Sequence, residues 1–122
     1  DEDRVRKLVR GMLVRMGYTV LEAAGGSEAV RLARESDTAI DLLLTDVVMP
    51  KMNGHELARR LESMRPGLHV VYMSGYMDNP VVHREVVESG APFLQKPFTQ
   101  EALARKVRAI LDEVRVQAKA AG

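Results

Sequence analysis

The sequence predicts an α/β fold with a parallel sheet, and three observations lead to this class. Short apolar runs that suit buried strands alternate with longer segments whose apolar residues recur at helical spacing. Strands that alternate with helices are joined by right-handed crossovers, which produce a parallel sheet. The last three runs each end at or next to a chemically active side chain: Asp46, Ser74 and Lys96. In an open parallel sheet, this is the edge where ligands bind.

The N-terminal half contains two predicted helices and two predicted strands. Asp3 can cap the first helix, and Gly17 ends it. Residues 18–21 form a short β-branched and aromatic run, which predicts a strand. The second helix opens at Ser27, with Glu28 behind it. Residues 40–46 contain the consecutive apolar residues Leu42-Leu43-Leu44, a run that is typical of a strand buried on both faces.

The C-terminal half contains three predicted helices and two predicted strands. Residues 56–64 carry apolar side chains on one helical face, and Pro66-Gly67 breaks the chain after them. The next strand is expected at residues 69–73. A helix follows over residues 80–89, and then a strand over residues 93–95. Thr99 caps the last and longest predicted helix.

Composition excludes several classes of protein. The 122 residues suit one domain with one core, and a net charge of +1 gives no bulk electrostatic case for nucleic acid or an anionic membrane. Cysteine is absent, so disulfides and thiolate metal sites are excluded. No apolar stretch approaches the roughly 20 residues that span a bilayer, and the acidic first residues do not resemble a basic leader. The histidines show no metal spacing and are expected to be structural or exposed: His55, His69 and His83.

The three strand-end residues suggest phosphoryl chemistry. A carboxylate at position 46 can attack phosphorus, an ammonium at position 96 can offset charge, and a hydroxyl at position 74 can bond a phosphoryl oxygen. Each residue also has a plainer interpretation. Asp46 can be a helix cap or a loop ion pair, Ser74 a turn residue, and Lys96 a surface lysine.

The motifs around these residues resemble the receiver domain of two-component response regulators. The residues that carry the resemblance are Leu44-Thr45-Asp46-Val47-Val48-Met49-Pro50-Lys51-Met52-Asn53-Gly54, Met73-Ser74-Gly75-Tyr76 and Phe93-Leu94-Gln95-Lys96-Pro97-Phe98. The likeness runs from Asp1 to about residue 112. It implies a flavodoxin-like three-layer sandwich with strand order 2-1-3-4-5, in which the first strand is missing from this chain. We expect residues 1–116 to form the receiver domain and residues 117–122 to be a frayed tail.

The missing strand would leave unpaired backbone groups in the middle of the sheet, at about 1–3 kcal/mol for each buried group. We therefore expect the chain to be a fragment of a longer one. The alternative is that another segment fills the gap.

The resemblance implies a role for each residue of the site. Asp46 would be the phosphoacceptor, and Lys96, before a cis Pro97, would contact it and later the phosphoryl group. Ser74 would bond a phosphoryl oxygen. Phe93 stands at the family's switch position but lacks a hydroxyl, so it would switch by ring packing or serve as an ordinary core residue.

A Mg²⁺ site and its flanking residues also follow from the resemblance. Asp1, Asp46 and the backbone carbonyl of Val47 would ligate Mg²⁺, whose preference is for oxygen. The first acid of the family's acidic pair is missing from this chain, so we expect the chain to bind Mg²⁺ poorly. Asp1 can instead belong to an acidic helix start. Val48 and Tyr76 would flank the site and hinder water, or simply pack in their loops.

The implied partner is a histidine kinase or a histidine phosphotransfer domain. A cytoplasmic location, no binding of nucleic acid and no membrane insertion are expected, and a homodimer is compatible with the family. The motifs look most like receivers fused to hybrid sensor histidine kinases, with a stand-alone regulator as the competitor. One alternative is a pseudo-receiver that binds partners without phosphotransfer. A hydrolase with an Asp nucleophile ranks last, because it needs a second acid where Val48 stands.

Overall fold

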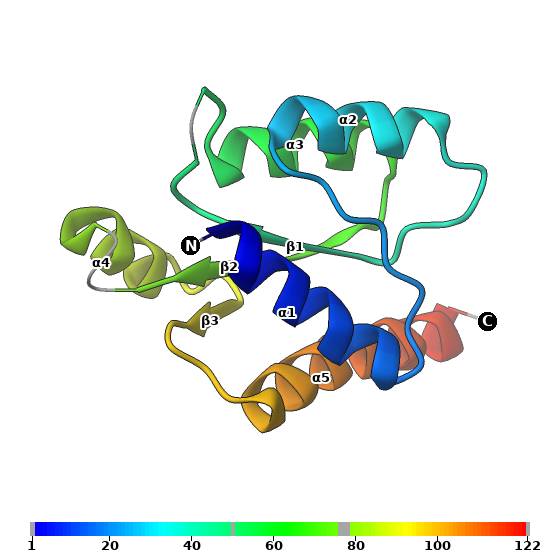
Figure 1. Ribbon diagram of the computed structural model, residues 1–122. Coiled ribbons are helices and arrows are strands. Elements are labelled where there is room, and N and C mark those ends of the chain that lie inside the picture. The colour runs from blue at the N-terminus through cyan, green and yellow to red at the C-terminus, as the bar shows by residue number, and fades with distance from the viewer. Residues whose placement is uncertain (1, 50, 76–78, 122) are drawn as a thin grey trace.

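The structure is a parallel sheet between two layers of helices (Figure 1). The computed structural model describes residues 2–49, 51–75 and 79–121, and their side chains between residues 4 and 112. The elements in chain order are α1 (Glu2–Arg15), α2 (Gly26–Glu35), β1 (Leu42–Asp46), α3 (Gly54–Met64), β2 (His69–Ser74), α4 (Pro80–Ser89), β3 (Phe93–Gln95) and α5 (Gln100–Ala121).

The sheet has the order β1-β2-β3, and both pairings are parallel. Asp46 pairs with Met73 across β1 and β2, and Ser74 pairs with Gln95 across β2 and β3. This order matches the 3-4-5 part of the predicted order, which confirms the α/β class. Because the strands are parallel, their carboxyl ends share one edge of the sheet.

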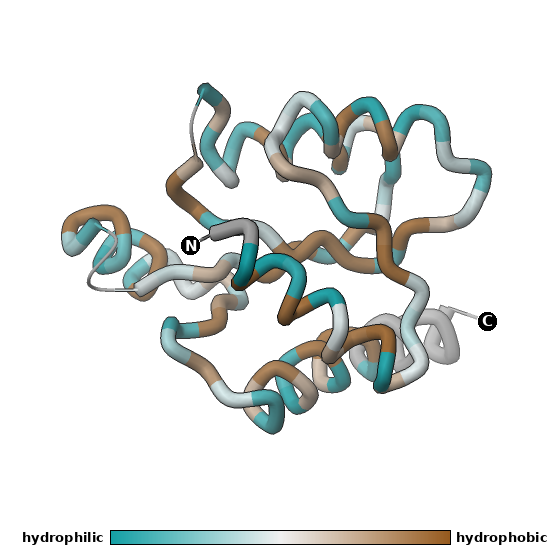
Figure 2. Tube along the Cα trace, viewed as in Figure 1, coloured by the Kyte–Doolittle hydropathy of each residue, from teal (hydrophilic) through white to brown (hydrophobic). Residues whose placement is uncertain are grey.

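The apolar side chains of the sheet divide between its two faces. On one face, Val71 and Leu94 pack with Leu103 and Val107 of α5 and with Val9 of α1. On the other face, the strands pack against α2, α3 and α4 in two further clusters. Figure 2 shows brown, hydrophobic strands at the centre, while the helices alternate between brown and teal. This alternation is the one-sided burial that the helical spacing predicts.

Polar but uncharged residues cap the three helices that follow the strands. Asn53 accepts a hydrogen bond from the backbone of Glu56 at 2.8 Å, at the start of α3. Asn79 accepts from the backbone of Val81 and Val82 at the start of α4. Thr99 accepts from Ala102 at 3.1 Å, which confirms the predicted cap of α5. These bonds satisfy backbone N–H groups that have no partner inside a helix.

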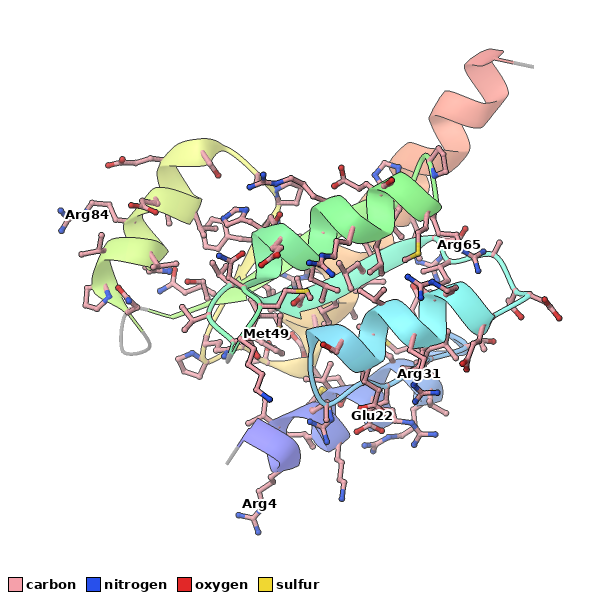
Figure 3. The ribbon with its side chains drawn as sticks, turned by 90° about the horizontal axis from the view of Figure 1, so that it is seen from above. Arg4, Glu22, Arg31, Met49, Arg65 and Arg84 are labelled. Carbon is pink, nitrogen blue, oxygen red and sulfur yellow. The ribbon has the colours of Figure 1, made fainter. Side chains whose placement is uncertain are left out.

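One arginine holds the end of α2 against the end of α3. The Arg65 guanidinium donates to the carbonyls of Ala33 at 2.9 Å, Ser36 at 2.6 Å and Thr38 at 3.1 Å. Figure 3 labels Arg65 beside the C-terminal ends of these two helices. Carbonyls at a helix end lack partners within the helix, so a single side chain here replaces several missing hydrogen bonds.

The predicted strand at residues 18–21 is wrong, because the structure has no strand there. A strand needs a neighbour for its backbone hydrogen bonds. None of the described strands pairs with this segment, because the described pairings join only β1 with β2 and β2 with β3. Tyr18 instead packs against the α1 and α5 cluster, and Glu22 forms ion pairs with Arg6 and Arg10.

Candidate functional site

The parallel sheet brings the three predicted site residues to one edge. Asp46 is the last residue of β1, Ser74 is the last residue of β2, and Lys96 follows β3 directly. Main-chain hydrogen bonds tie these ends together. The N–H of Lys96 donates to the carbonyl of Ser74 at 2.9 Å, and the N–H of Val47 donates to the carbonyl of Met73 at 3.2 Å.

Asp46 and Lys96 form an ion pair at this edge. Lys96 Nζ lies 2.5 Å from Asp46 Oδ1, and each side chain is about one quarter exposed. Oδ1 itself is buried and has no hydrogen-bond partner among the described residues, so the contact is one of charge without hydrogen-bond alignment. The Lys96 ammonium therefore offsets the charge of this buried carboxylate oxygen.

The backbone beside Asp46 is held by two further hydrogen bonds. Thr45 Oγ1 donates to the carbonyl of Asp46 at 3.0 Å. The carbonyl of Val47, a predicted metal ligand, accepts from the N–H of Gly54 at 2.8 Å. A carbonyl oxygen has two lone pairs, so this bond leaves one lone pair for a cation. Val47 is buried, whereas the next residue, Val48, is 45% exposed.

The hydroxyl of Ser74 is buried and has a histidine as its partner. Ser74 Oγ lies 3.0 Å from His83 Nδ1 in α4, and both residues are buried. Sequence reasoning missed this contact and placed His83 only among structural or exposed residues. The available signal was the spacing of His83 and Val86, which puts both on the buried face of α4.

Two other predicted residues, Pro97 and Phe93, are also described. The Lys96–Pro97 peptide bond is cis, which confirms that prediction. Phe93 is half-buried and meets the His83 ring edge-on, with the ring centroids 6.0 Å apart. The switch role of Phe93 stays a prediction.

The remaining predicted residues, Asp1 and Tyr76, lie outside the described residues, as does Pro50 of the motif. Within the described ranges, no group of three or more carboxylate or imidazole side chains could hold a metal ion. The described residues therefore contribute Asp46 and the Val47 carbonyl to the predicted Mg²⁺ site. None of the described helices combines the length and the apolar character that are needed to cross a membrane.

Comparison with known proteins adds a family. The family model described as the response regulator receiver domain matches residues 1–108. The sensor kinase CckA of Brucella abortus is 36% identical over 113 residues, which are 93% of this chain and 12% of that protein. The transcriptional regulatory protein SrrA of Staphylococcus aureus is 35% identical, over 91% of this chain and 45% of that protein. The chain thus spans less than half of each relative.

Solved structures agree with the sequence relatives. The crystal structure of the receiver domain from the hybrid histidine kinase CckA is 34% identical, has a TM-score of 0.74 and covers 91% of this chain and 93% of that chain. A response regulator receiver domain from Clostridium thermocellum has a TM-score of 0.76 at 24% identity, with 94% and 91% covered. The second likeness shows the fold alone.

Proposed function

Because this chain belongs to the family of response regulator receiver domains, we propose that it accepts a phosphoryl group on Asp46 in a two-component phosphorelay. The observation that carries the proposal is the arrangement of Asp46 and Lys96. The carboxylate has a buried oxygen without a hydrogen bond, and an ammonium lies 2.5 Å from that oxygen. A nucleophile and a counter-charge for phosphoryl oxygens are therefore in place together.

The donor in this proposal is a phosphohistidine of a histidine kinase or a histidine phosphotransfer domain. An Asp46 carboxylate oxygen forms a bond to phosphorus as the phosphorus–nitrogen bond of the donor breaks. The imidazole leaves with the bonding electrons and takes up a proton. The product is an acyl phosphate on Asp46, whose phosphoryl oxygens Lys96 then contacts and which switches a partner or an output.

The residues present fit Mg²⁺ in part. Asp46 offers a hard carboxylate oxygen and Val47 a carbonyl with a free lone pair, and Asp1 completes the proposed set. Bound there, the ion would offset charge on the phosphoryl oxygens. Ser74 donates a hydrogen bond to one of those oxygens, and Phe93 repacks.

The setting of the domain is also part of the proposal. The likeness to a sensor kinase and to the receiver of a hybrid histidine kinase supports a place in a hybrid kinase in the cytoplasm. A transcriptional regulatory protein is nearly as similar, so a separate regulator is the competing setting.

Phosphorylation with a small phosphodonor and Mg²⁺ tests the proposal. The protein should gain one phosphoryl group in intact mass, and peptide mapping should place it on Asp46. Asp46→Asn should abolish the gain. Asp41→Asn is the matched control, because Asp41 is an exposed carboxylate just before the same strand. Phosphorylation of Asp46→Asn to the wild-type level would refute the assignment of Asp46. A wild-type protein that gains no phosphoryl group would favour the pseudo-receiver.

A further inference from the structure

A buried histidine of α4 contacts the Ser74 hydroxyl of the candidate site. Ser74 is 4% exposed and His83 is 8% exposed, and their side chains meet at 3.0 Å. The proposed phosphoryl transfer gives His83 no task. Among the described residues, the hydrogen-bond partner of the Ser74 hydroxyl is His83. The hydroxyl that is to bond a phosphoryl group is therefore already engaged elsewhere.

The register of the sheet places Ser74 and Asp46 on opposite faces. Side chains two residues apart on a strand share a face. Ser74 therefore shares its face with Tyr72, which packs with Val86 of α4. Asp46 is two residues from Leu44, which packs in the cluster of α5 on the other face. The hydroxyl thus points toward α4 and has to turn to reach a group on the carboxylate.

We propose that His83 is a positioning residue that holds the Ser74 hydroxyl on the α4 side, so that His83 and a phosphoryl group on Asp46 compete for it. This inference rests on the proposed function. The competition is one of position, because Oγ has to leave His83 Nδ1 whichever partner carries the proton. A buried hydrogen bond then opposes phosphorylation, and its loss frees α4 from the end of β2.

Removal of the imidazole should make the site easier to occupy. Beryllofluoride mimics a phosphoryl group on a carboxylate, and its affinity can be measured by NMR titration in excess Mg²⁺. His83→Leu should raise this affinity about two- to tenfold, which is the range for loss of one such hydrogen bond. His83→Asn should restore the wild-type value, because its amide takes the place of Nδ1.

A double-mutant cycle separates positioning from packing. In a Ser74→Ala background, His83→Leu should leave the beryllofluoride affinity unchanged, because there is no hydroxyl to hold. As an independent readout, the ¹⁵N chemical shift of His83 Nδ1 should change when beryllofluoride binds. In the Ser74→Ala variant without beryllofluoride, this chemical shift should differ from the wild-type value in the same direction.

Three outcomes would overturn the inference while the proposed function stands. The first is an unchanged or lower beryllofluoride affinity in His83→Leu. The second is an equal increase in affinity when His83→Leu is made in the Ser74→Ala background. The third is a ¹⁵N chemical shift of His83 Nδ1 that does not change when beryllofluoride binds. Failure of wild-type protein to bind beryllofluoride at Asp46 would instead overturn the proposed function, and this inference with it.

Discussion

Gly54 lies so close to the main chain of Asp46 that a side chain cannot fit between them. A Cβ at position 54 would collide with the Asp46 carbonyl oxygen and lie 3.0 Å from the Cα of Val47. The N–H of Gly54 also bonds the Val47 carbonyl. The start of α3 therefore rests directly on the backbone that presents the proposed phosphoacceptor. This contact explains physically why a glycine follows Asp46 at this spacing.

Gly54→Ala should destabilise the protein by about 1–3 kcal/mol, because backbone rather than a flexible side chain has to move. It should also slow phosphorylation of Asp46. Gly11→Ala is the control, since its Cβ would meet only the Arg15 side chain, at 3.6 Å. That variant should gain about 0.5–1 kcal/mol from helix propensity. Urea unfolding gives both values, and equal effects would contradict the steric argument.

Lys96→Ala should separate stability from chemistry. The ion pair with Asp46 is partly exposed, so its loss should change the free energy of unfolding by no more than about 1 kcal/mol. Phosphorylation by a small phosphodonor should slow about a hundredfold, because a fixed charge at the reacting oxygens is lost. Lys7→Ala, on the exposed surface of α1, should change neither. Phosphorylation of Lys96→Ala at the wild-type rate would contradict a role for Lys96 in the reaction.

Val48 and Tyr76 should lengthen the life of the acyl phosphate. Val48 is 45% exposed and offers no polar group to orient an attacking water. Val48→Asn together with Tyr76→Ser should speed dephosphorylation about tenfold, a barrier change of roughly 1.4 kcal/mol. Val87→Asn, at an exposed valine of α4, is the control. Loss of phosphate is followed by intact mass. The same half-life of the acyl phosphate in the wild type, the double variant and the control would contradict the shielding of Asp46 from water.

Arg65 should matter more to stability than a surface arginine. Its guanidinium serves three backbone carbonyls at the end of α2, so Arg65→Ala should cost about 1–3 kcal/mol. Arg60→Ala removes only an exposed pair with Glu56, which is worth about 0.2–0.5 kcal/mol. Arg65→Lys should fall between them, because an ammonium cannot span all three carbonyls. Chemical unfolding would rank the variants by their free energy of unfolding. A different order would contradict the stabilising role of the hydrogen bonds from Arg65 to the three carbonyls.

Tyr72 makes stability depend on pH in the alkaline range. Burial and, less strongly, the nearby Glu62 raise the pKa of Tyr72 above 10.0, while Arg59 opposes the shift. The folded protein therefore holds this proton more tightly than the unfolded chain does. The resulting stability is complete below pH 10 and is lost as the pH rises through the folded-state pKa. Tyr72→Phe should flatten that decline in urea unfolding, and an identical decline would argue against it.

Local patterns could predict most of the framework. The apolar runs gave the positions of β1, β2 and β3, and their parallel pairing brought Asp46, Ser74 and Lys96 to one edge, as expected. Resemblance to a family, and not the dipeptide, led to the cis bond before Pro97. The predicted strand at residues 18–21 failed because local propensity does not supply a hydrogen-bonding neighbour.

The contacts that the sequence could not reveal join residues of different helices, strands and loops. Arg65 donates hydrogen bonds to carbonyls about thirty residues earlier in the chain. His83 of α4 contacts Ser74 at the end of β2. Each residue alone is typical of a surface or a core position. Their roles depend on where α2 and α4 come to rest against their neighbours, which helical spacing does not specify.

The uncharged caps of α3, α4 and α5 have an electrostatic consequence. All three helices start just after the strand ends, so the positive ends of three helix dipoles face the edge that holds Asp46. Asn53, Asn79 and Thr99 satisfy backbone N–H groups there without adding negative charge. An aspartate in any of these places would cap equally well and repel an incoming phosphoryl group. The caps themselves thus leave the attraction of these helix ends for an anion intact, whereas Glu56 and Glu101 in the first turns of α3 and α5 offset part of it.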